Sequence, residues 1–300
     1  MSKPHRVSIG LPVYNGARYL SGTVEALLGQ TYGDFELVIS DNHSTDATEE
    51  IARDFAARDD RVRYHRNSHN VGLIANFNGV FKLAEGELFK WCGADDLCQP
   101  RYLERCVEAL DADPDAVLVY PRTQFIDDAG QPMPIEDPGF HLRSADPAER
   151  FRYVILANHW VNAVNGLIRR SALNRTRLQR PYPGGDYALL GELCLLGTFV
   201  ELPETLFLRR LHGGASSQIR SRQDLVELIL GRRNGRGLVL PTWQRTFDHL
   251  QTIVWADISW SRRFSLMGTL ARGLYWRRQR LLDDLVCAAR ALSRRLVSRS

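Results

Sequence analysis

The first 120 residues alternate between short apolar runs and stretches with helical spacing, and this alternation limits the possible folds most strongly. Apolar runs at 6–11, 35–40, 62–66, 87–91 and 116–120 predict strands. Between them, apolar residues recur with a helical period over 18–30, 46–58, 71–84 and from Pro100 onward. Strands that alternate with helices predict a mostly parallel sheet with helices on both faces.

A sheet of this kind binds ligands beyond the carboxyl ends of its strands. Four polar, turn-rich segments follow the predicted strands, at 12–15, 41–46, 67–72 and 93–96, so we expect the chemistry there. Beyond residue 120 the alternation stops. Pro and Gly residues at 129–147 predict a loop or small hairpin, 161–168 and 198–210 predict strands, and 186–196 predicts a helix. Residues 213–222 are small and polar and could form a lid.

Two adjacent carboxylates, Asp95 and Asp96, come directly after the apolar run 87–91. Neighbouring buried carboxylates repel one another unless a cation lies beside them. Hard oxygen ligands at a strand end suit Mg²⁺ or Mn²⁺ shared with a phosphate. The alternative is a turn that caps the helix beginning near Pro100, because Asp-Asp pairs are common in loops.

Three further polar positions have both a functional and a structural interpretation. Asp41, after the second predicted strand, could accept bonds from a ribose or a base. Asp186 follows Gly184-Gly185 and is either a helix cap or a general base on a flexible turn. His212, preceded by Arg209-Arg210-Leu211, could bind a metal or a diphosphate, or be a solvated loop residue.

The sequence lacks the motifs of several common kinds of binding and catalytic site. The chain has no G-x-G-x-x-G, no G-x-x-x-x-G-K-[ST] and no G-x-S-x-G, which argues against a dinucleotide site, a Walker-type loop and a hydrolase elbow. A sugar-nucleotide pyrophosphorylase would carry a Gly-rich basic loop after its first strand. That place holds Pro12-Val13-Tyr14-Asn15 instead.

Taken together and in order, these segments resemble a family-2 inverting glycosyltransferase of the bacterial polysaccharide type, with the A-type glycosyltransferase fold. The resemblance covers about Val7 to His212. It rests on the following pieces: Ile9 to Asn15, Tyr19-Leu20, Gln30 to Tyr32, Glu36 to Asp41, Ser44 to Thr48, Asn70 to Gly72, Gly86, Asp95-Asp96 and Asp186.

The resemblance implies roles for these residues. Pro12, Val13, Tyr14 and the Asp41 carboxylate would hold the nucleoside, usually uridine. Asp95 would contact the ribose, and Asp96, Asp95 and His212 would hold Mn²⁺ or Mg²⁺ on the diphosphate. Asp186 would deprotonate the acceptor hydroxyl. The expected donor site also includes Asn15, Asn70, Gly72 and Arg210.

Two departures from the family pattern bear on these roles. The family often shows Asp-x-Asp-Asp, whereas the first position here is Gly93, so the metal role falls on Asp95 or Asp96. The base is commonly preceded by Glu, whereas here Gly185 precedes Asp186. Glu192, further along the same predicted helix, is therefore a second candidate base.

The basic charge is concentrated at the end of the chain. Ten arginines against two aspartates give residues 262–300 a net charge of +8, and since the whole chain carries +4, residues 1–261 carry −4. From Met267, apolar residues recur with helical spacing: Leu270, Leu274, Leu281, Leu285, Ala288, Leu292 and Leu296. This Arg-rich helix could dock on an anionic membrane, pack on its own protein or form a homodimer contact.

We therefore expect residues 1–220 to form the nucleotide-sugar-binding catalytic domain and 221–300 a helical extension. The expected activity is metal-assisted inverting transfer from a UDP-sugar to a saccharide or lipid-linked acceptor in surface polysaccharide synthesis. The alternative is a non-catalytic sugar-nucleotide-binding scaffold subunit. Five cysteines without a C-x-x-C pair favour the cytoplasm, with a peripheral contact at the inner face of the cell membrane if the tail docks. No nucleic-acid-binding module accompanies the basic charge.

Overall fold

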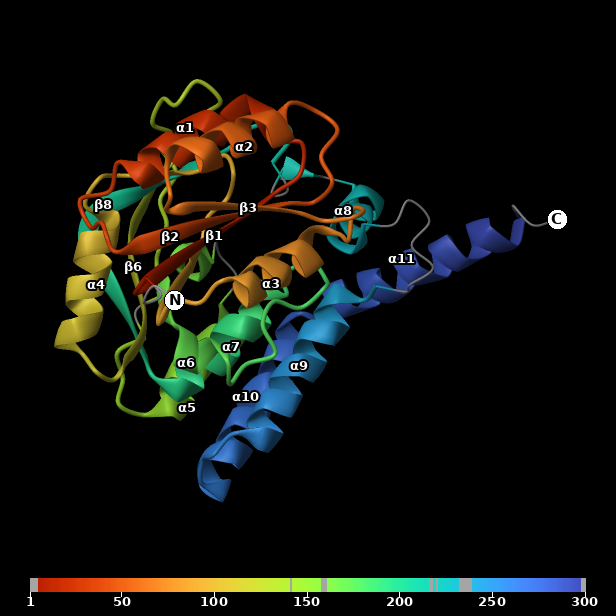
Figure 1. The fold of residues 1–300 in the computed structure, drawn as a ribbon. Helices are drawn as coiled ribbons and strands as arrows, with labels where there is room; N and C mark the ends of the chain where they lie inside the picture. The colour runs from red at the N-terminus through yellow and green to blue at the C-terminus, as the bar shows by residue number, and fades with distance from the viewer. Residues whose placement is uncertain are drawn as a thin grey trace.

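The strands of this chain form one mixed sheet in the order β3-β2-β1-β4-β7-β6-β8-β5 (Figure 1). The structure is a computed structural model that describes residues 5–140, 142–157, 161–215, 218–219, 221–231 and 239–297, apart from the side chains of 222, 223 and 290–297. Its strands are β1 (Val7–Val13), β2 (Phe35–Asp41), β3 (Val62–Arg66), β4 (Leu88–Trp91), β5 (Leu97–Cys98), β6 (Ala116–Ile126), β7 (Leu167–Arg169) and β8 (Thr198–Arg210).

The amino-terminal half of the sheet is parallel, as the alternation predicts. β1 lies between β2 and β4, and β3 pairs with β2. Side chains alternate between the two faces: Leu37 and Ile39 join one apolar cluster, and Val38 joins the other. The first cluster includes side chains of α1 (Ala17–Leu28), α2 (Thr48–Arg58) and α4 (Tyr102–Ala112), and the second includes α3 (Leu73–Leu83). Helices on both faces confirm the predicted fold.

The second half of the sheet is mixed. β7 is antiparallel to β4 and β6, whereas β6 and β8 run parallel. The prediction of a strand over 161–168 is wrong: residues 162–165 form the 3₁₀ turn η1 (Asn162–Asn165), and only β7 follows. The carbonyl of Asn165 accepts hydrogen bonds from Lys90 Nζ and the Tyr102 hydroxyl. These long-range contacts favour a turn where the apolar pattern favours a strand.

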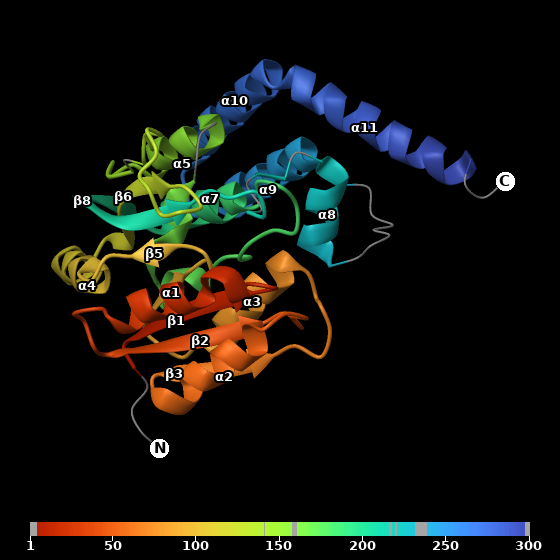
Figure 2. The same cartoon turned by 90° about the horizontal axis from the view of Figure 1, so that it is seen from above.

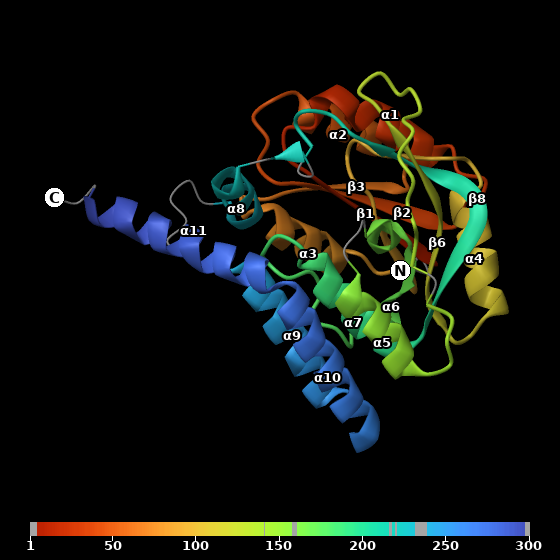
Figure 3. The same cartoon turned by 180° about the vertical axis from the view of Figure 1, so that it is seen from behind.

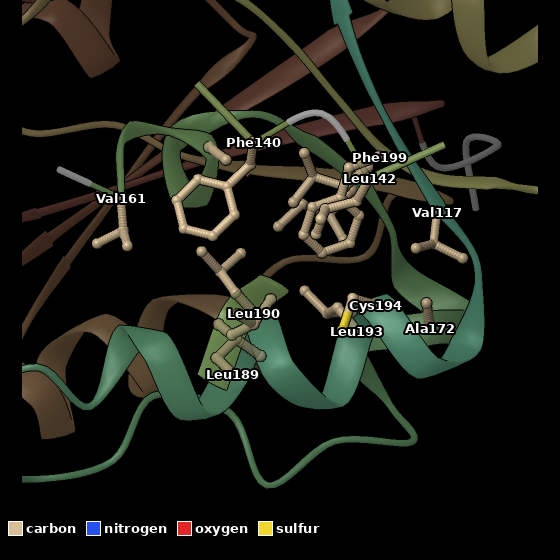
Figure 4. Close-up of a cluster of buried hydrophobic side chains, with 14 of the residues drawn as sticks. Val117, Phe140, Leu142, Val161, Ala172, Leu189, Leu190, Leu193, Cys194 and Phe199 are labelled. Carbon is tan, nitrogen blue, oxygen red and sulfur yellow. The ribbon is translucent and has the colours of Figure 1, made fainter. Parts of the chain in front are cut away.

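Helix α7 (Asp186–Leu196) positions the predicted base and occupies the predicted range. Leu190, Leu193 and Cys194 of this helix point toward Phe140, Leu142 and Phe199 (Figure 4). All six side chains are at most 2% exposed. α5 (Pro147–Leu156) and the short α6 (Arg170–Leu173) pack beside α7. The first residue of α7 is thereby fixed relative to the sheet.

Four helices follow β8: α8 (Arg222–Leu230), α9 (Pro241–Trp255), α10 (Trp260–Trp276) and α11 (Arg278–Val297). α8 packs on α3, α9 on α7, and α10 on α5. α9 and α10 lie side by side, and α11 extends away from the sheet (Figures 1 and 3). Among the residues that the structure describes, no helix is both long and apolar enough to cross a membrane.

The apolar stripe predicted from Met267 onward belongs to two helices and largely faces inward. Leu270, Leu281 and Ala288 are buried, while Leu285 is exposed. The side chains of Leu292 and Leu296 lie outside the described residues, as do residues 216, 217 and 220 of the predicted lid. Ile253, Leu266 and Leu270 share an apolar cluster with the sheet, so the predicted extension packs into the same core as the predicted catalytic domain.

Candidate active site

The carboxyl ends of β1 and β2 meet at a shallow depression of about 270 Å³. Its lining comes from the end of β1, the loops after β2 and β3, helix α3 and one side chain of α8: Pro12, Val13, Tyr14, Asn42, Asn70, Leu73, Asn76 and Leu228. Four predicted donor-site residues, Pro12, Val13, Tyr14 and Asn70, therefore lie together. Among the residues that the structure describes, no charged side chain lines the depression, which suits a nucleoside better than a diphosphate.

Buried amide side chains fix the floor of this depression. Asn42 Nδ2 donates to Asn70 Oδ1 over 2.9 Å, and Asn67 Nδ2 donates to Asn42 Oδ1 over 3.1 Å. Asn76 Oδ1 accepts from Ser40 Oγ at 2.7 Å and from Asn67 at 3.0 Å. Sequence reasoning missed Asn42 and Asn76. The available signal was an amide directly after a buried strand and another within an apolar helix.

Asp41 lies beneath this floor and is fully buried. Its carboxylate accepts hydrogen bonds from the Ser44 amide at 2.8 Å, the Tyr64 hydroxyl at 2.8 Å and Arg66 Nη1 at 2.9 Å. Three protein donors therefore already occupy the group expected to contact the nucleoside. Here Asp41 orders the loop after β2, and a direct contact with the donor stays a prediction.

Asn15 and Gly72 shape the loops around the depression rather than its lining. Asn15 has a left-handed φ of 51° and accepts a bond from the Thr45 amide at its Oδ1, at 2.8 Å. Gly72 has a φ of +93°, and a Cβ there would lie 2.6 Å from the carbonyl oxygen of Ile229. Glycine at position 72 thus lets the end of α8 approach the start of α3.

The acidic pair lies after β4, at the same edge of the sheet. An oxygen of Asp95 and an oxygen of Asp96 would each lie 2.8 Å from a Cβ placed on Gly93. Both carboxylates therefore point toward Gly93, the position where the resembling family often carries another Asp. A third carboxylate at position 93 would crowd the first two.

Asp96 is 7% exposed and carries an unfavourable negative charge. Burial, and then the neighbouring Asp95 charge, raise the pKa of Asp96 to about 7. The positive charge of Arg209 and the hydrogen bond from the Arg210 amide, at 3.0 Å, oppose this rise. Burial therefore disfavours the charged form of Asp96, and a cation bound beside it would favour that form.

His212 contacts Asp95 through Nε2 and Oδ2, which lie 2.9 Å apart. Its other ring nitrogen, Nδ1, accepts a hydrogen bond from the Gly214 amide at 3.2 Å. Nε2 therefore carries the proton and donates it to Asp95. The imidazole also lies against the Tyr19 ring, with 4.8 Å between the ring centroids. His212 is thus held beside the acidic pair, and its role toward a metal or diphosphate stays a prediction.

The two arginines before His212 have different surroundings. Arg210 donates to the carbonyls of Asp95, Asp127 and Asp128, over 3.0–3.1 Å, so its side chain ties loops together. Arg209 instead acts electrostatically on both Asp96 and Asp186. The donor-site role predicted for Arg210 stays a prediction, and Arg209, which the sequence did not single out, acts on two of the carboxylates.

Asp186 is the first residue of α7, and its Oδ1 accepts a bond from the Tyr187 amide at 3.0 Å. Burial raises the pKa of Asp186 above its usual value, although part of its surface stays exposed. A partly exposed carboxylate with a raised pKa is a suitable general base. Arg209 and Arg245 oppose this rise.

The second candidate base, Glu192, has a structural environment. Its carboxylate accepts hydrogen bonds from the amide and the guanidinium of Arg177. Arg177 also pairs with the buried Asp248 of α9 at 2.9 Å. Glu192 therefore joins α7 to α9, and the geometry favours Asp186 as the base.

The acidic residues fit a divalent cation, although they do not form a complete cage. Among the side chains that the structure describes, no three His, Cys, Asp or Glu residues are grouped as a protein-only metal site requires. Mg²⁺ and Mn²⁺ at diphosphate sites need only one or two carboxylates, because phosphate oxygens and water supply the rest. The two carboxylates beside Gly93 meet this requirement.

Comparison of the sequence with known families identifies one match. The family model described as glycosyl transferase family 2 matches residues 8–177. An uncharacterised glycosyltransferase of Haemophilus influenzae is 23% identical over 229 residues, which cover 72% of this chain and 69% of that protein. A chondroitin synthase of Escherichia coli is 29% identical over 219 residues, covering 70% of this chain but only 30% of the synthase.

Solved structures share the fold at low sequence identity. S. aureus TarS 1–349, in complex with UDP-GlcNAc, superposes with a TM-score of 0.70 at 15% identity, covering 95% of this chain and 81% of the other. The mannosyltransferase PcManGT of Pyrobaculum calidifontis, in complex with GDP-Man and Mn²⁺, gives a TM-score of 0.54 at 16% identity. This match covers 96% of this chain and 87% of PcManGT.

Proposed function

The chain belongs to glycosyl transferase family 2, and we propose that it transfers a sugar, with inversion, from a nucleotide-diphosphate sugar to a saccharide or lipid-linked acceptor. One observation carries the proposal: the charge of Arg209 acts on both Asp96 and Asp186, and Asp96 follows β4 at the sheet edge that also holds the depression. A nucleoside site, a diphosphate site and a base are thereby brought together.

The depression lined by Pro12, Tyr14 and Asn70 would hold the nucleoside. A lining of apolar side chains and neutral amides suits a nucleoside. We propose UDP as the nucleotide. The resemblance to the UDP-using members of the family supports this choice, as does the fold shared with a protein that binds UDP-GlcNAc.

We propose that Asp96 and Asp95, with His212 beside them, hold Mn²⁺ or Mg²⁺. When bound, such an ion stabilises the negative charge that develops on the leaving diphosphate. Asp96 would lose its proton on binding, because the raised pKa leaves it partly protonated near neutral pH. His212 keeps Asp95 oriented through the bond from Nε2.

Asp186 would accept the proton of the acceptor hydroxyl as that oxygen attacks the anomeric carbon. Direct in-line attack inverts the configuration, so one base suffices and no covalent nucleophile is needed. The positive charge of Arg209 would act on Asp186 and on Asp96 of the acidic pair at the same time. We propose a role in surface glycan synthesis in the cytoplasm, which the five free cysteines favour.

Product analysis tests this proposal directly. The protein is incubated with UDP-GlcNAc, UDP-glucose or UDP-galactose, with Mn²⁺ and a panel of free and lipid-linked saccharides. Phosphorus NMR should show UDP, and proton coupling in the product should show an inverted anomeric centre. Pyrophosphate would identify a nucleotidyltransferase instead. Donor binding without turnover on any acceptor would favour the scaffold alternative.

A further inference from the structure

The C-terminal helices expose large apolar side chains that the fold does not cover. In α10, Trp260, Phe264, Gly268, Ala271 and Tyr275 recur at helical spacing and are all exposed, so they form one stripe along about 22 Å of the helix. Trp260 is 69% and Phe264 67% exposed. The opposite side of α10, with Leu266 and Leu270, is buried against the body.

Helix α9 repeats this arrangement beside α10. Its exposed apolar residues also share one side of the helix: Trp243, Phe247, Leu250 and Val254. Trp255, at the end of α9, is 73% exposed and lies close in sequence to Trp260 at the start of α10. We call the exposed side chains of Trp255, Trp260, Phe264 and Tyr275 the aromatic face.

The charge around the aromatic face is mostly positive, although Asp257 lies between Trp255 and Trp260, and Arg262 pairs with Asp146 at 3.1 Å. Residues 258–282 contain six arginines and no Asp or Glu. Arg263 lies over the Trp260 ring, 4.7 Å from its centroid, and Arg278 lies over the Tyr275 ring at 4.6 Å. Cations are therefore held against the exposed rings themselves.

We propose that the aromatic face docks on an anionic lipid bilayer. Tryptophan and tyrosine prefer the interface between lipid and water, and arginine beside them pairs with lipid phosphate. A second copy of this chain would bring its arginines against those of the first, with few acidic residues nearby to pair with them. Charge complementarity thus favours the lipid surface over a dimer.

The same helices reach the proposed base from their inner side. Arg245 of α9 lies over the Tyr187 ring at 5.0 Å, next to Asp186, and its charge acts on Asp186. Arg277, at the end of α10, has its pKa lowered to about 10 by burial and by the charges of Arg245 and Arg280. If the proposed function holds, docking would keep the enzyme at the surface that carries a lipid-linked acceptor.

Vesicle sedimentation tests the docking without any donor or acceptor, so its result is independent of the transferase activity. The full chain should sediment with vesicles of phosphatidylcholine and phosphatidylglycerol, and far less with phosphatidylcholine alone. The double variant Trp260→Ser/Phe264→Ser should lose about tenfold or more of this partition. Phe264→Trp should keep it, because tryptophan also favours the interface.

Charge reversal gives a second arm with a matched control. Arg272→Glu should weaken binding to the anionic vesicles about fivefold, and Arg53→Glu, on α2 at the far side of the molecule (Figures 1 and 2), should not. No sedimentation of the wild type, or equal sedimentation of the double variant, would overturn the proposal. So would a dimer in sedimentation velocity that the double variant abolishes.

Discussion

The depression and the reaction centre lie at the same sheet edge but are stabilised in opposite ways. In the depression, neutral amides satisfy one another, as Asn42, Asn70 and Asn76 do with Asn67 and Ser40. In the reaction centre, the charges of Arg209 and Lys90 act on Asp96, those of Arg209 and Arg245 act on Asp186, and His212 donates to Asp95. The depression is therefore stable without a ligand, whereas the reaction centre becomes more stable when a cation binds.

This difference separates binding from chemistry. Residues of the depression should act on the stability of the fold and on donor affinity together. Residues of the reaction centre should act on turnover and metal binding, and their removal can stabilise the empty protein. Four substitutions test this division.

The largest effect is expected at the proposed base. Asp186→Asn should lower kcat about 10²–10⁴-fold, because general base catalysis is worth that much, and should leave donor affinity nearly unchanged. Steady-state kinetics and calorimetry with the same donor measure both. Glu192→Gln is the matched control: it should cost stability through its bonds to Arg177 and spare kcat. The reverse pattern would make Glu192 the base.

In the depression, Asn76→Leu should destabilise the protein by about 1–3 kcal/mol, since it leaves buried polar groups of Ser40 and Asn67 without their partner. Donor affinity should fall with it, while kcat at saturating donor should not. Urea unfolding and calorimetry are the measurements. Asn78→Leu, on the same helix and bonded to Gln179, provides a control for the loss of a helical amide. Equal donor affinities in wild type and Asn76→Leu would contradict the role of the amide floor.

The proton on Asp96 makes a prediction about pH. With its native pKa raised to about 7, the folded state holds this proton more tightly than the unfolded state does. The resulting stabilisation is complete below pH 4 and is lost as the pH rises through 7. Without metal, the stability of Asp96→Asn relative to the wild type should therefore increase as the pH rises from about 4 to about 8. Thermal unfolding at each pH measures this difference. A stability difference that does not change with pH would show that the pKa of Asp96 is not raised in the folded protein.

Gly93→Ala should have the smallest effect. Its Cβ would approach oxygens of both Asp95 and Asp96 to 2.8 Å, so the carboxylates must move apart. We expect a few-fold weaker Mn²⁺ dependence of donor binding and little change in metal-free stability. Gly79→Ala, in α3 with no atom within 4 Å of the new Cβ, serves as the control. Unchanged Mn²⁺ dependence in Gly93→Ala would show that the carboxylates tolerate the new methyl group.

The sequence predicts local features of the fold and misses what distant contacts decide. Apart from the two-residue strand β5, which forms by pairing with the distant β8, the strands and helices up to residue 120 follow from periodicity, because each buries a regular face of its own. The 3₁₀ turn at Asn162–Asn165 depends on Lys90 and Tyr102, far away in the chain, and no local pattern shows them. The apolar pattern of the tail likewise does not show which side chains are buried. Leu270 and Leu281 pack against the body, while Trp260 and Phe264 stay exposed.

The residues of the site also divide into those that the local sequence predicts and those that depend on distant contacts. Motif order brings Pro12, Asn70, Asp95, Asp96, His212 and Asp186 to one edge. The effect of Arg209 on Asp96 and Asp186 is not evident from the sequence, because β8 turns neighbouring side chains to different faces. Leu228 reaches the depression from a helix that local pattern assigns to a separate extension.

The central claim is that a cation and a nucleotide-diphosphate sugar bind together at the acidic pair. Calorimetry with UDP-, GDP- and dTDP-sugars, each with Mn²⁺ and with EDTA, on wild type and Asp96→Ala, tests it most directly. The account predicts binding of one nucleotide class that needs Mn²⁺ and is lost in Asp96→Ala. Equal affinity with EDTA, or in Asp96→Ala, would contradict it.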